Sequence, residues 1–202
     1  MRTYPKIIFC FAAWLLAISL GSASAQRGAL TVHRNIAELT QQAATIVHGQ
    51  IISTRVESHP ELTNLTTLVV TMRVSEKLKG NADSTLVFRQ YIWDVRDKYD
   101  AAGYHKGQEM LVLLNPVSSY GLTSPTGMEQ GRFLITRDER GTPVTANGYS
   151  NAGLFSDLEA QASSKKIQLS PSTSMLVRQH IRGPVPLSQL ETLIRQFAGT
   201  SK

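Results

Sequence analysis

The sequence contains a single cysteine, Cys10, which lies close to the N-terminus. A chain that lost its first 25 residues would contain no cysteine, so disulfides, thiolate nucleophiles and cysteine-based zinc sites would be excluded. Exported eukaryotic domains of this size usually carry disulfides. The lack of cysteine therefore favours a bacterial protein of the periplasm or the extracellular medium.

Long hydrophobic runs are also lacking, apart from one at the N-terminus. Two basic residues precede an uncharged stretch from Ile7 to Leu20, and the small residues Ala23 and Ala25 follow it. This order is typical of a secretory signal peptide. The stretch is 14 residues long, whereas a membrane span needs about 20. We expect residues 1–25 to be cleaved and the exported chain to have no transmembrane anchor.

A strong charge of either sign is lacking as well. Beyond residue 25 the chain has 19 basic and 15 acidic residues, a net charge of +4 that is spread along the sequence. The only basic doublet there, Lys165-Lys166, is not interleaved with aromatic residues. The usual footprint of a nucleic-acid-binding protein is therefore absent, and we expect no nucleic-acid partner.

Motifs typical of catalysis are missing. The chain has no Gly-x-Ser-x-Gly elbow, P-loop, dinucleotide fingerprint or His-Glu-x-x-His motif. No histidine has a second histidine three to five residues away, so the sequence contains no compact metal half-site. We therefore predict no catalytic residue, no metal ligand and no cofactor. The alternative is a hydrolase site that the fold assembles from scattered residues, namely His48, His105 and the group Asp94, Asp97 and Asp100.

What the sequence does contain is a series of short segments with the composition of β-strands. From Thr67 to Leu78, apolar residues alternate with residues that are mostly polar. This alternation predicts a strand with one buried face. The run Met110–Leu114 is apolar throughout and predicts a strand buried on both faces. Gly49 inside the first segment predicts a bulge or a bend. The remaining strands are expected at 46–56, 85–92, 120–124 and 132–136, with a return of the chain through 142–146.

Two segments have the pattern of helices. Asn35 followed by Glu38 forms a capping box, which predicts a short helix to about Ala44. Ser188 and Glu191 form a second capping box ahead of an amphipathic C-terminal helix, whose apolar residues recur at helical spacing: Leu190, Leu193, Ile194 and Phe197. We expect this apolar stripe to pack on the β-domain. Docking on a partner or a membrane surface is the alternative.

The order of these elements predicts a mainly β protein. Six short strands separated by turn signals favour a small antiparallel OB-like barrel, with a short N-terminal helix and an amphipathic C-terminal helix. The predicted organisation is a signal peptide at 1–25, a β-barrel domain at 26–148, and a C-terminal helix at 184–202. Between them, residues 149–183 are rich in Ser, Gln, Gly and Lys and are expected to be loosely ordered, with room for two short helices.

Four stretches carry a resemblance to known proteins: IVHGQIIST, VVTMRVSEKLKG, KGQEMLVLLNP and GLTSPTGMEQGRF. Their pattern resembles uncharacterised exported bacterial proteins and is similar to the netrin-like, TIMP-like version of the OB barrel. The resemblance covers about residues 30–135 and implies a fold. TIMP-type inhibitors act on metallopeptidases through an N-terminal cysteine, which this chain lacks after residue 25, so the resemblance assigns no inhibitory residue.

The segment from Tyr91 to Lys106 is the most suggestive of binding. It contains the only tryptophan beyond residue 25, and basic residues alternate there with aspartates. Aromatic residues and arginine in a long connection are typical of recognition loops. The alternative is that Tyr91 and Trp93 cap the core. The candidate binding residues are Tyr91, Trp93, Arg96, Tyr99 and Tyr104.

These observations predict an exported, non-enzymatic binding module of the periplasm or the extracellular medium. We expect the partner to be an envelope or secreted protein, with a carbohydrate as the second ligand class. A second loop, Ser118 to Gly131, is a candidate to complete the same surface, and the alternative is that it is an ordinary connector rich in Gly and Pro. The alternative from another class is a structural or assembly factor of the envelope that uses the C-terminal helix.

The predicted signal peptide leads to a direct test. We expect the exported protein to begin at Gln26, because Ala23 and Ala25 are the small residues that a signal peptidase accepts. Intact mass spectrometry of protein recovered from envelope and culture fractions measures this start. Recovery of a chain that still carries residues 1–25 would contradict cleavage.

Overall fold

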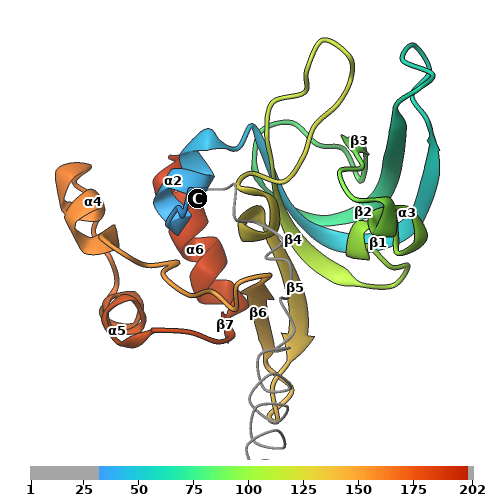
Figure 1. Ribbon diagram of the computed structural model, residues 1–202. Helices are drawn as coiled ribbons and strands as arrows, with labels where there is room; N and C mark the ends of the chain where they lie inside the picture. The colour runs from blue at the N-terminus through green and yellow to red at the C-terminus, as the bar shows by residue number, and fades with distance from the viewer. Residues whose placement is uncertain (1–31, 200–202) are drawn as a thin grey trace, which may run out of the picture. The chain divides into compact units, whose positions relative to one another are not determined.

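The computed structural model describes residues 32–199, so the predicted signal peptide at 1–25 lies outside the described residues. In the described part, a seven-stranded antiparallel sheet is combined with several short helices (Figure 1). The order of the strands across the sheet is β3-β2-β1-β4-β5-β6-β7. Within these residues, none of the helices has the length and apolar character that crossing a bilayer requires. The mainly β prediction is confirmed.

The strands and helices have the following bounds. The strands are β1 (Thr45–Ser58), β2 (Thr66–Lys79), β3 (Thr85–Tyr91), β4 (Glu109–Leu114), β5 (Arg132–Arg137), β6 (Pro143–Asn147) and β7 (Val185–Pro186). The α-helices are α2 (Ile36–Gln42), α3 (Val95–Tyr99), α4 (Leu158–Ser164), α5 (Pro171–Gln179) and α6 (Leu187–Ala198). Two short 3₁₀ helices, η1 (Ala101–Gly103) and η2 (Met128–Gly131), lie in connections.

The sheet is open, with β3 and β7 at its two edges, so the expected OB-like barrel is not confirmed. The predicted strand at 120–124 is a loop that reaches the edge strand β3 only through one parallel bridge, from Leu122 to Arg89. Strand β7 has only two residues, which is too short for a sequence pattern to reveal. The sheet needs no closure because helices, rather than further strands, cover the face that would otherwise be wet.

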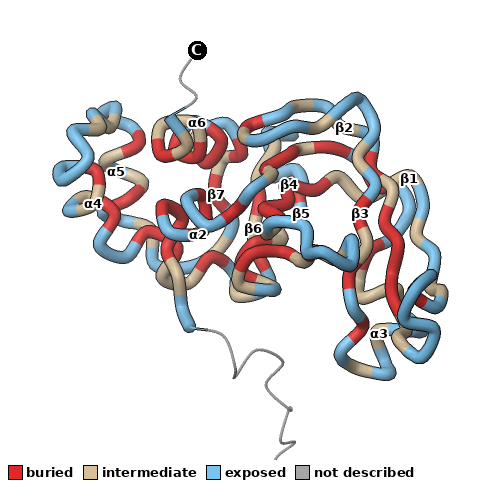
Figure 2. The backbone as a smooth tube through the Cα atoms, turned by 90° about the horizontal axis from the view of Figure 1, so that it is seen from above, coloured by how far each residue is buried: buried red, intermediate tan, exposed pale blue. Residues whose placement is uncertain are grey.

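Strands β1 and β4 separate two apolar cores. Alternate residues of β4 lie in different clusters: Leu111 and Leu113 pack with the helices, whereas Met110 and Val112 pack with β1, β2 and β3. Because successive side chains of a strand point to opposite faces, these clusters lie on the two faces of the sheet. The prediction that Met110–Leu114 is buried on both faces is confirmed. In Figure 2, buried residues (red) occur both among the helices and along β1 to β4.

Helix α6 fills the core on the helix side. As the helical spacing predicted, its apolar stripe is buried. The stripe consists of Leu190, Leu193, Ile194 and Phe197. The second predicted capping box is wrong, because α6 begins at Leu187, one residue before Ser188, and its N-cap Pro186 has no side-chain bond. Glu191 is therefore not a capping residue but lies on the buried face of the helix. The first capping box is confirmed at α2, where Asn35 and Glu38 bond each other's backbone N–H at 3.0 Å.

The segment 149–183, expected to be loosely ordered, contains α4 and α5. Its side chains Leu154 and Leu158 are fully buried, and together with Val177 they belong to the core on the helix side. Both helices lie at the far end of the described part from α3 (Figures 1 and 2). The polar residues that dominate the segment therefore lie mainly on its outer face, while a few apolar residues pack into the core.

The bulge predicted at Gly49 is confirmed and shapes the centre of the sheet. His48 lies opposite Glu76 on β2, but Gly49 lies opposite Val74, so β2 has one additional residue at this point. A Cβ atom on Gly49 would lie 2.1 Å from the carbonyl oxygen of Arg73. Such a bulge increases the local twist and redirects neighbouring side chains. Only glycine allows β1 and β2 to approach this closely beside His48.

A Gly49→Ala substitution should lower the free energy of unfolding by about 3 kcal/mol, because the added methyl group collides with backbone that cannot move without breaking the strand pair. Chemical denaturation measures the change. Gly141→Ala is the control: Gly141 lies in an open turn at φ +79° with no atom near its missing Cβ, and it should lose only about 1–2 kcal/mol. A loss at position 49 no larger than that at 141 would contradict the close approach.

Candidate functional site

Exposed apolar side chains gather along a short stretch at the edge of the sheet. Tyr91 ends the edge strand β3, Trp93 follows it, and Val95 and Tyr99 are the first and last residues of α3. We call these four residues the aromatic patch. Trp93, Val95 and Tyr99 are 72%, 69% and 86% exposed, and α3 buries none of its residues. The rings of Tyr91 and Trp93 meet edge to face with centroids 5.0 Å apart.

Local polar contacts stabilise the single turn of α3, which has no buried side chain. The Asp94 carboxylate caps the helix by accepting a hydrogen bond from the Arg96 backbone N–H at 2.9 Å. The Arg96 side chain donates from Nε to both oxygens of the same carboxylate, at 3.0 and 2.9 Å. Val95 and Tyr99 are four residues apart and so lie on one side of the helix. The turn thus keeps its apolar side toward solvent.

Tyr104 does not belong to this surface, and here the structure corrects the set of candidate binding residues. Its side chain is only 1% exposed and packs in the core between β1, β2, β3 and β4. The ring meets Phe88 edge to face at 5.8 Å, and the Arg132 guanidinium lies 4.8 Å from its centroid. Burial raises the pKa of the Tyr104 hydroxyl to about 12. Tyr104 follows η1 and returns toward the sheet, which a single sequence does not reveal.

The second predicted loop lies beside the same edge strand. The backbone N–H of Thr123 donates to the Arg89 carbonyl at 2.8 Å, and Leu122 forms the parallel bridge to Arg89. Arg89 precedes Tyr91 by two residues, so both side chains point to the same face of β3. The Ser118–Gly131 loop therefore borders the aromatic patch at its strand end.

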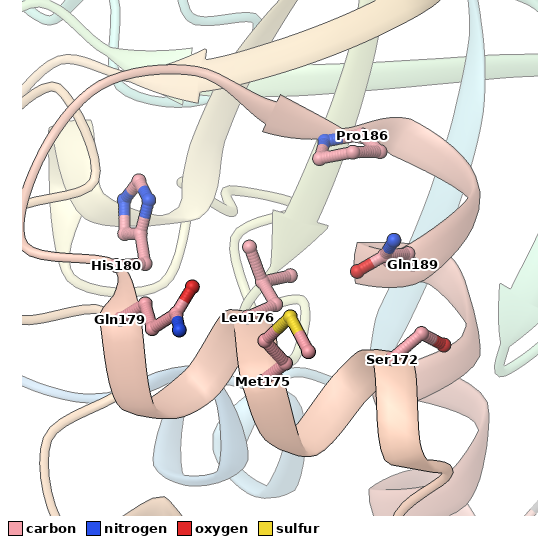
Figure 3. A pocket seen from close by; sticks show the side chains of 7 residues that line it. All are labelled: Ser172, Met175, Leu176, Gln179, His180, Pro186 and Gln189. Carbon is pink, nitrogen blue, oxygen red and sulfur yellow. The ribbon is translucent and has the colours of Figure 1, made fainter.

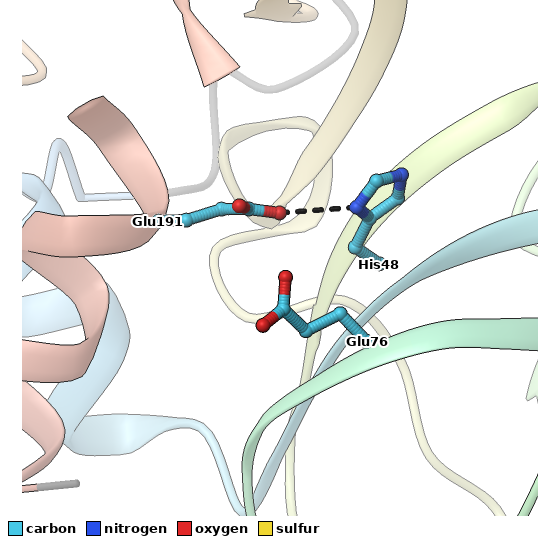
Figure 4. A group of neighbouring side chains, drawn as sticks. All are labelled: His48, Glu76 and Glu191. Carbon is cyan, nitrogen blue, oxygen red and sulfur yellow. Dashed lines mark hydrogen bonds and ion pairs between the residues drawn. The ribbon is translucent and has the colours of Figure 1, made fainter. Parts of the chain in front are cut away.

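A second group of polar side chains lies where α6 crosses the sheet. We call it the α6–sheet cluster; its members are His48 on β1, Glu76 on β2, Glu109 on β4, and Glu191 and Arg195 on α6. His48 Nδ1 lies 3.0 Å from Glu191 Oε1, and its Nε2 lies 2.9 Å from Glu109 Oε1. The Arg195 guanidinium donates to the Glu76 carboxylate. Figure 4 shows His48, Glu76 and Glu191 converging from three elements.

The strand register explains why these side chains meet. His48 lies directly opposite Glu76, and Glu109 lies diagonally from it because its own partner is Gln50. Directly opposite and diagonal positions on one sheet face are within reach of long side chains. On α6, Glu191 and Arg195 are four residues apart, so both face the sheet from one side of the helix. The bulge at Gly49 sets the alignment of β1 with β2 at this point.

Burial makes the cluster electrostatically strong. The side chains of His48 and Glu191 are 13% and 10% exposed, whereas Glu76 and Glu109 lie partly in solvent. The hydrogen bond to Glu191 is the main cause that raises the pKa of His48 above its ordinary 6.5; burial opposes it, and Glu109 adds to it. His48, Glu76 and Glu191 each offer an atom that could bind a metal ion. The sequence prediction of no metal ligand did not foresee this grouping.

The residues grouped in the hydrolase alternative are brought together only in part. His48 binds Glu191 and Glu109, as described above. His105 Nε2 pairs with Asp100 at 3.4 Å, and both side chains are more than half exposed. Asp94 binds Arg96. These contacts join His105 to Asp100 and link neither of them to His48.

A shallow groove of about 410 Å³ lies between α5 and the start of α6 (Figure 3). Apolar side chains line much of it, and two buried polar atoms among its residues, His180 Nε2 and Gln189 Oε1, have no hydrogen-bond partner in the part of the chain that the structure describes. Burial lowers the pKa of His180. The full lining is Ser172, Met175, Leu176, Gln179, His180, Pro186 and Gln189.

Comparison of the chain with protein-family models, curated proteins and solved structures finds no match. The resemblance to OB-like exported proteins therefore stays a prediction.

The charge on His48 predicts how stability depends on pH. Because the pKa of His48 is raised in the folded state, its stabilising effect is complete below pH 6.5 and is lost as pH rises through the folded-state pKa. We expect His48→Gln to cost about 3 kcal/mol of unfolding free energy at pH 6 and clearly less at pH 9. Denaturation in the presence of a chelator at both pH values measures this.

The control for this experiment is His105→Gln, which removes an exposed histidine that is paired with an exposed aspartate. It should change stability little at either pH, since exposed ion pairs contribute about 0–1 kcal/mol. Equal losses for His48→Gln at pH 6 and pH 9 would contradict a charged His48 between Glu191 and Glu109.

Proposed function

We propose that this protein is an exported, non-enzymatic binding module that recognises an envelope or secreted protein through the aromatic patch. The observation that carries this proposal is that α3 buries none of its residues, while Val95, Tyr99 and the neighbouring Trp93 are each more than two-thirds exposed. Export rests on the predicted signal peptide at residues 1–25.

The patch has the composition of an interface centre. Tryptophan and tyrosine dominate the binding energy of protein interfaces, because each adds a large contact area and loses little conformational freedom. A run of exposed large apolar side chains on a folded domain usually marks an interaction surface. The edge-to-face contact between Tyr91 and Trp93 orders both rings before a partner arrives. This preorganisation lowers the entropic cost of binding.

The strand end of the patch is anchored in the fold. Tyr91 belongs to β3, whose Phe88 and Gln90 are buried on the other face of the strand. The loop at Leu122 and Thr123 binds the outer edge of β3 and limits its movement. Binding residues at the margin of a rigid sheet are typical of recognition domains.

A protein partner fits this surface better than a carbohydrate. Val87 on the outer face of β3 is 59% exposed and Val95 is 69% exposed, so the aromatic rings are accompanied by aliphatic side chains. Of the polar residues among them, Asp94 and Arg96 bind each other. A sugar would instead require polar side chains that are available to its hydroxyl groups.

The alternative is an assembly factor that docks through the C-terminal helix, and such docking would need an exposed apolar face on α6. The apolar stripe of α6 is buried in the core on the helix side. No observation in the described residues favours this alternative over the aromatic patch.

A photo-crosslinking residue at position 93 tests the proposal in the native host. Residues 26–202 are used as bait, and each captured protein is then purified and titrated against the wild-type chain by calorimetry. We expect the double variant Trp93→Ala/Tyr99→Ala to weaken binding at least about 30-fold, since aromatic anchors contribute 2 kcal/mol or more. The folded state of the variant is checked by circular dichroism.

The matched control is Met175→Ala/Ile181→Ala, which removes two apolar side chains that are 59% and 84% exposed at the far end of the molecule. It should leave the affinity unchanged. A partner that binds all three proteins equally, or that loses affinity only in the control, would contradict recognition through the aromatic patch.

A further inference from the structure

Three side chains in the α6–sheet cluster lie close enough together to bind one metal ion. His48 comes from β1, Glu76 from β2 and Glu191 from α6, and one ligand atom of each lies within 4.8 Å of the other two. Figure 4 shows all three pointing into the same space between helix and sheet. Tetrahedral zinc with bonds near 2.0 Å holds its ligand atoms about 3.3 Å apart. The separation of 3.0 Å between His48 Nδ1 and Glu191 Oε1 is close to this value.

The other ring nitrogen of His48 has the contact that metal-binding histidines need. A ligating histidine usually donates its second N–H to a carboxylate, which fixes the tautomer and makes the ring a better ligand. Here Nε2 lies 2.9 Å from Glu109 Oε1. With the proton on Nε2, the lone pair on Nδ1 points toward Glu191. A metal ion would take the place that the second ring proton occupies between Nδ1 and Glu191.

The charges also match a divalent cation. Three carboxylates, those of Glu76, Glu109 and Glu191, are accompanied by one permanent positive charge, that of Arg195. With a neutral His48, the cluster therefore carries a net charge of −2, and one divalent ion neutralises it. Because Glu191 is buried, an uncompensated charge there is costly.

We propose that His48, Glu76 and Glu191 bind one first-row transition-metal dication, with Zn²⁺ as the representative ion, and that Glu109 positions His48 as a ligand. Imidazole together with carboxylates favours zinc and its neighbours over magnesium or calcium, which prefer oxygen ligands alone. The partial exposure of Glu76 and Glu109 leaves the site accessible to solvent. The ion would join α6 to two strands of the sheet.

Arg195 acts as a competitor for one ligand. Its guanidinium binds the Glu76 carboxylate, and Glu76 must share or leave this contact to bind a metal ion. The positive charge of Arg195 also repels an incoming cation. Removing the Arg195 charge should therefore tighten metal binding. If the cluster had only a structural role, the same change would remove an ion pair and lower stability without creating tighter metal binding.

The test is a calorimetric titration of Zn²⁺ into chelator-stripped residues 26–202. We expect one high-affinity ion per chain and a rise in the melting temperature, because ions that bind only the folded state stabilise it. His48→Gln should weaken this binding by at least about 100-fold, and Glu109→Gln by about 10-fold or more. Glu109 is partly exposed, so its substitution should preserve the fold. Arg195→Met should bind Zn²⁺ more tightly than the wild type.

The control is His105→Gln, because His105 and Asp100 form the exposed histidine–aspartate pair at which adventitious zinc would bind. It should bind Zn²⁺ as the wild type does. The proposal is overturned if the wild type binds no Zn²⁺ with the ion in large excess, if His105→Gln rather than His48→Gln abolishes binding, or if Glu109→Gln and Arg195→Met both leave the affinity unchanged. The aromatic-patch variants serve as a further control, since they should bind Zn²⁺ normally whether or not the partner proposal holds.

Discussion

Helix α6 packs across the centre of the sheet, and the rest of the structure depends on this contact. Six side chains of the helix are buried, of which all but Glu191 are apolar. At about 1.5–3 kcal/mol for each large apolar side chain, this is one of the main stabilising contacts. Without α6, the apolar side chains on the helix-facing side of β1, β4 and β5 would be exposed to water. The sheet can remain open because this helix and α2 replace the strands that would close a barrel.

A polar cluster lies inside this apolar contact. Replacing such a buried cluster by apolar residues is often neutral or stabilising, so its presence needs a reason other than stability. Glu191 interrupts the apolar stripe of α6 and can satisfy its charge only opposite His48, so it fixes how the helix is rotated on the sheet. A metal ion at the same place would serve the same end with greater strength, and it would account for the excess of carboxylates.

The two proposed sites are separated by the architecture. The aromatic patch lies beyond the edge strand β3 and on α3, whereas the α6–sheet cluster lies on the face of the sheet that the helices cover. Strands β1 and β2 connect them, since His48 and Glu76 lie toward one end of this long pair, and Thr67, the partner of Tyr91, lies toward the other. The proposed binding surface therefore belongs to the part of the sheet around the core formed by β1 to β4, and the proposed metal site belongs to the helix-covered part.

The sequence by itself determined the local elements. Alternation and apolar runs gave most strands to within two residues, the capping box at Asn35 located α2, and Gly49 indicated the bulge, because these features depend on neighbours along the chain. The aromatic segment was visible for the same reason, although burial of Tyr104 was not. Only the tertiary structure decided that the sheet stays open and that Glu191 meets His48 across 143 residues. Such pairings depend on how distant elements pack, and the capping-box pattern assigned to Glu191 only a place near the start of a helix.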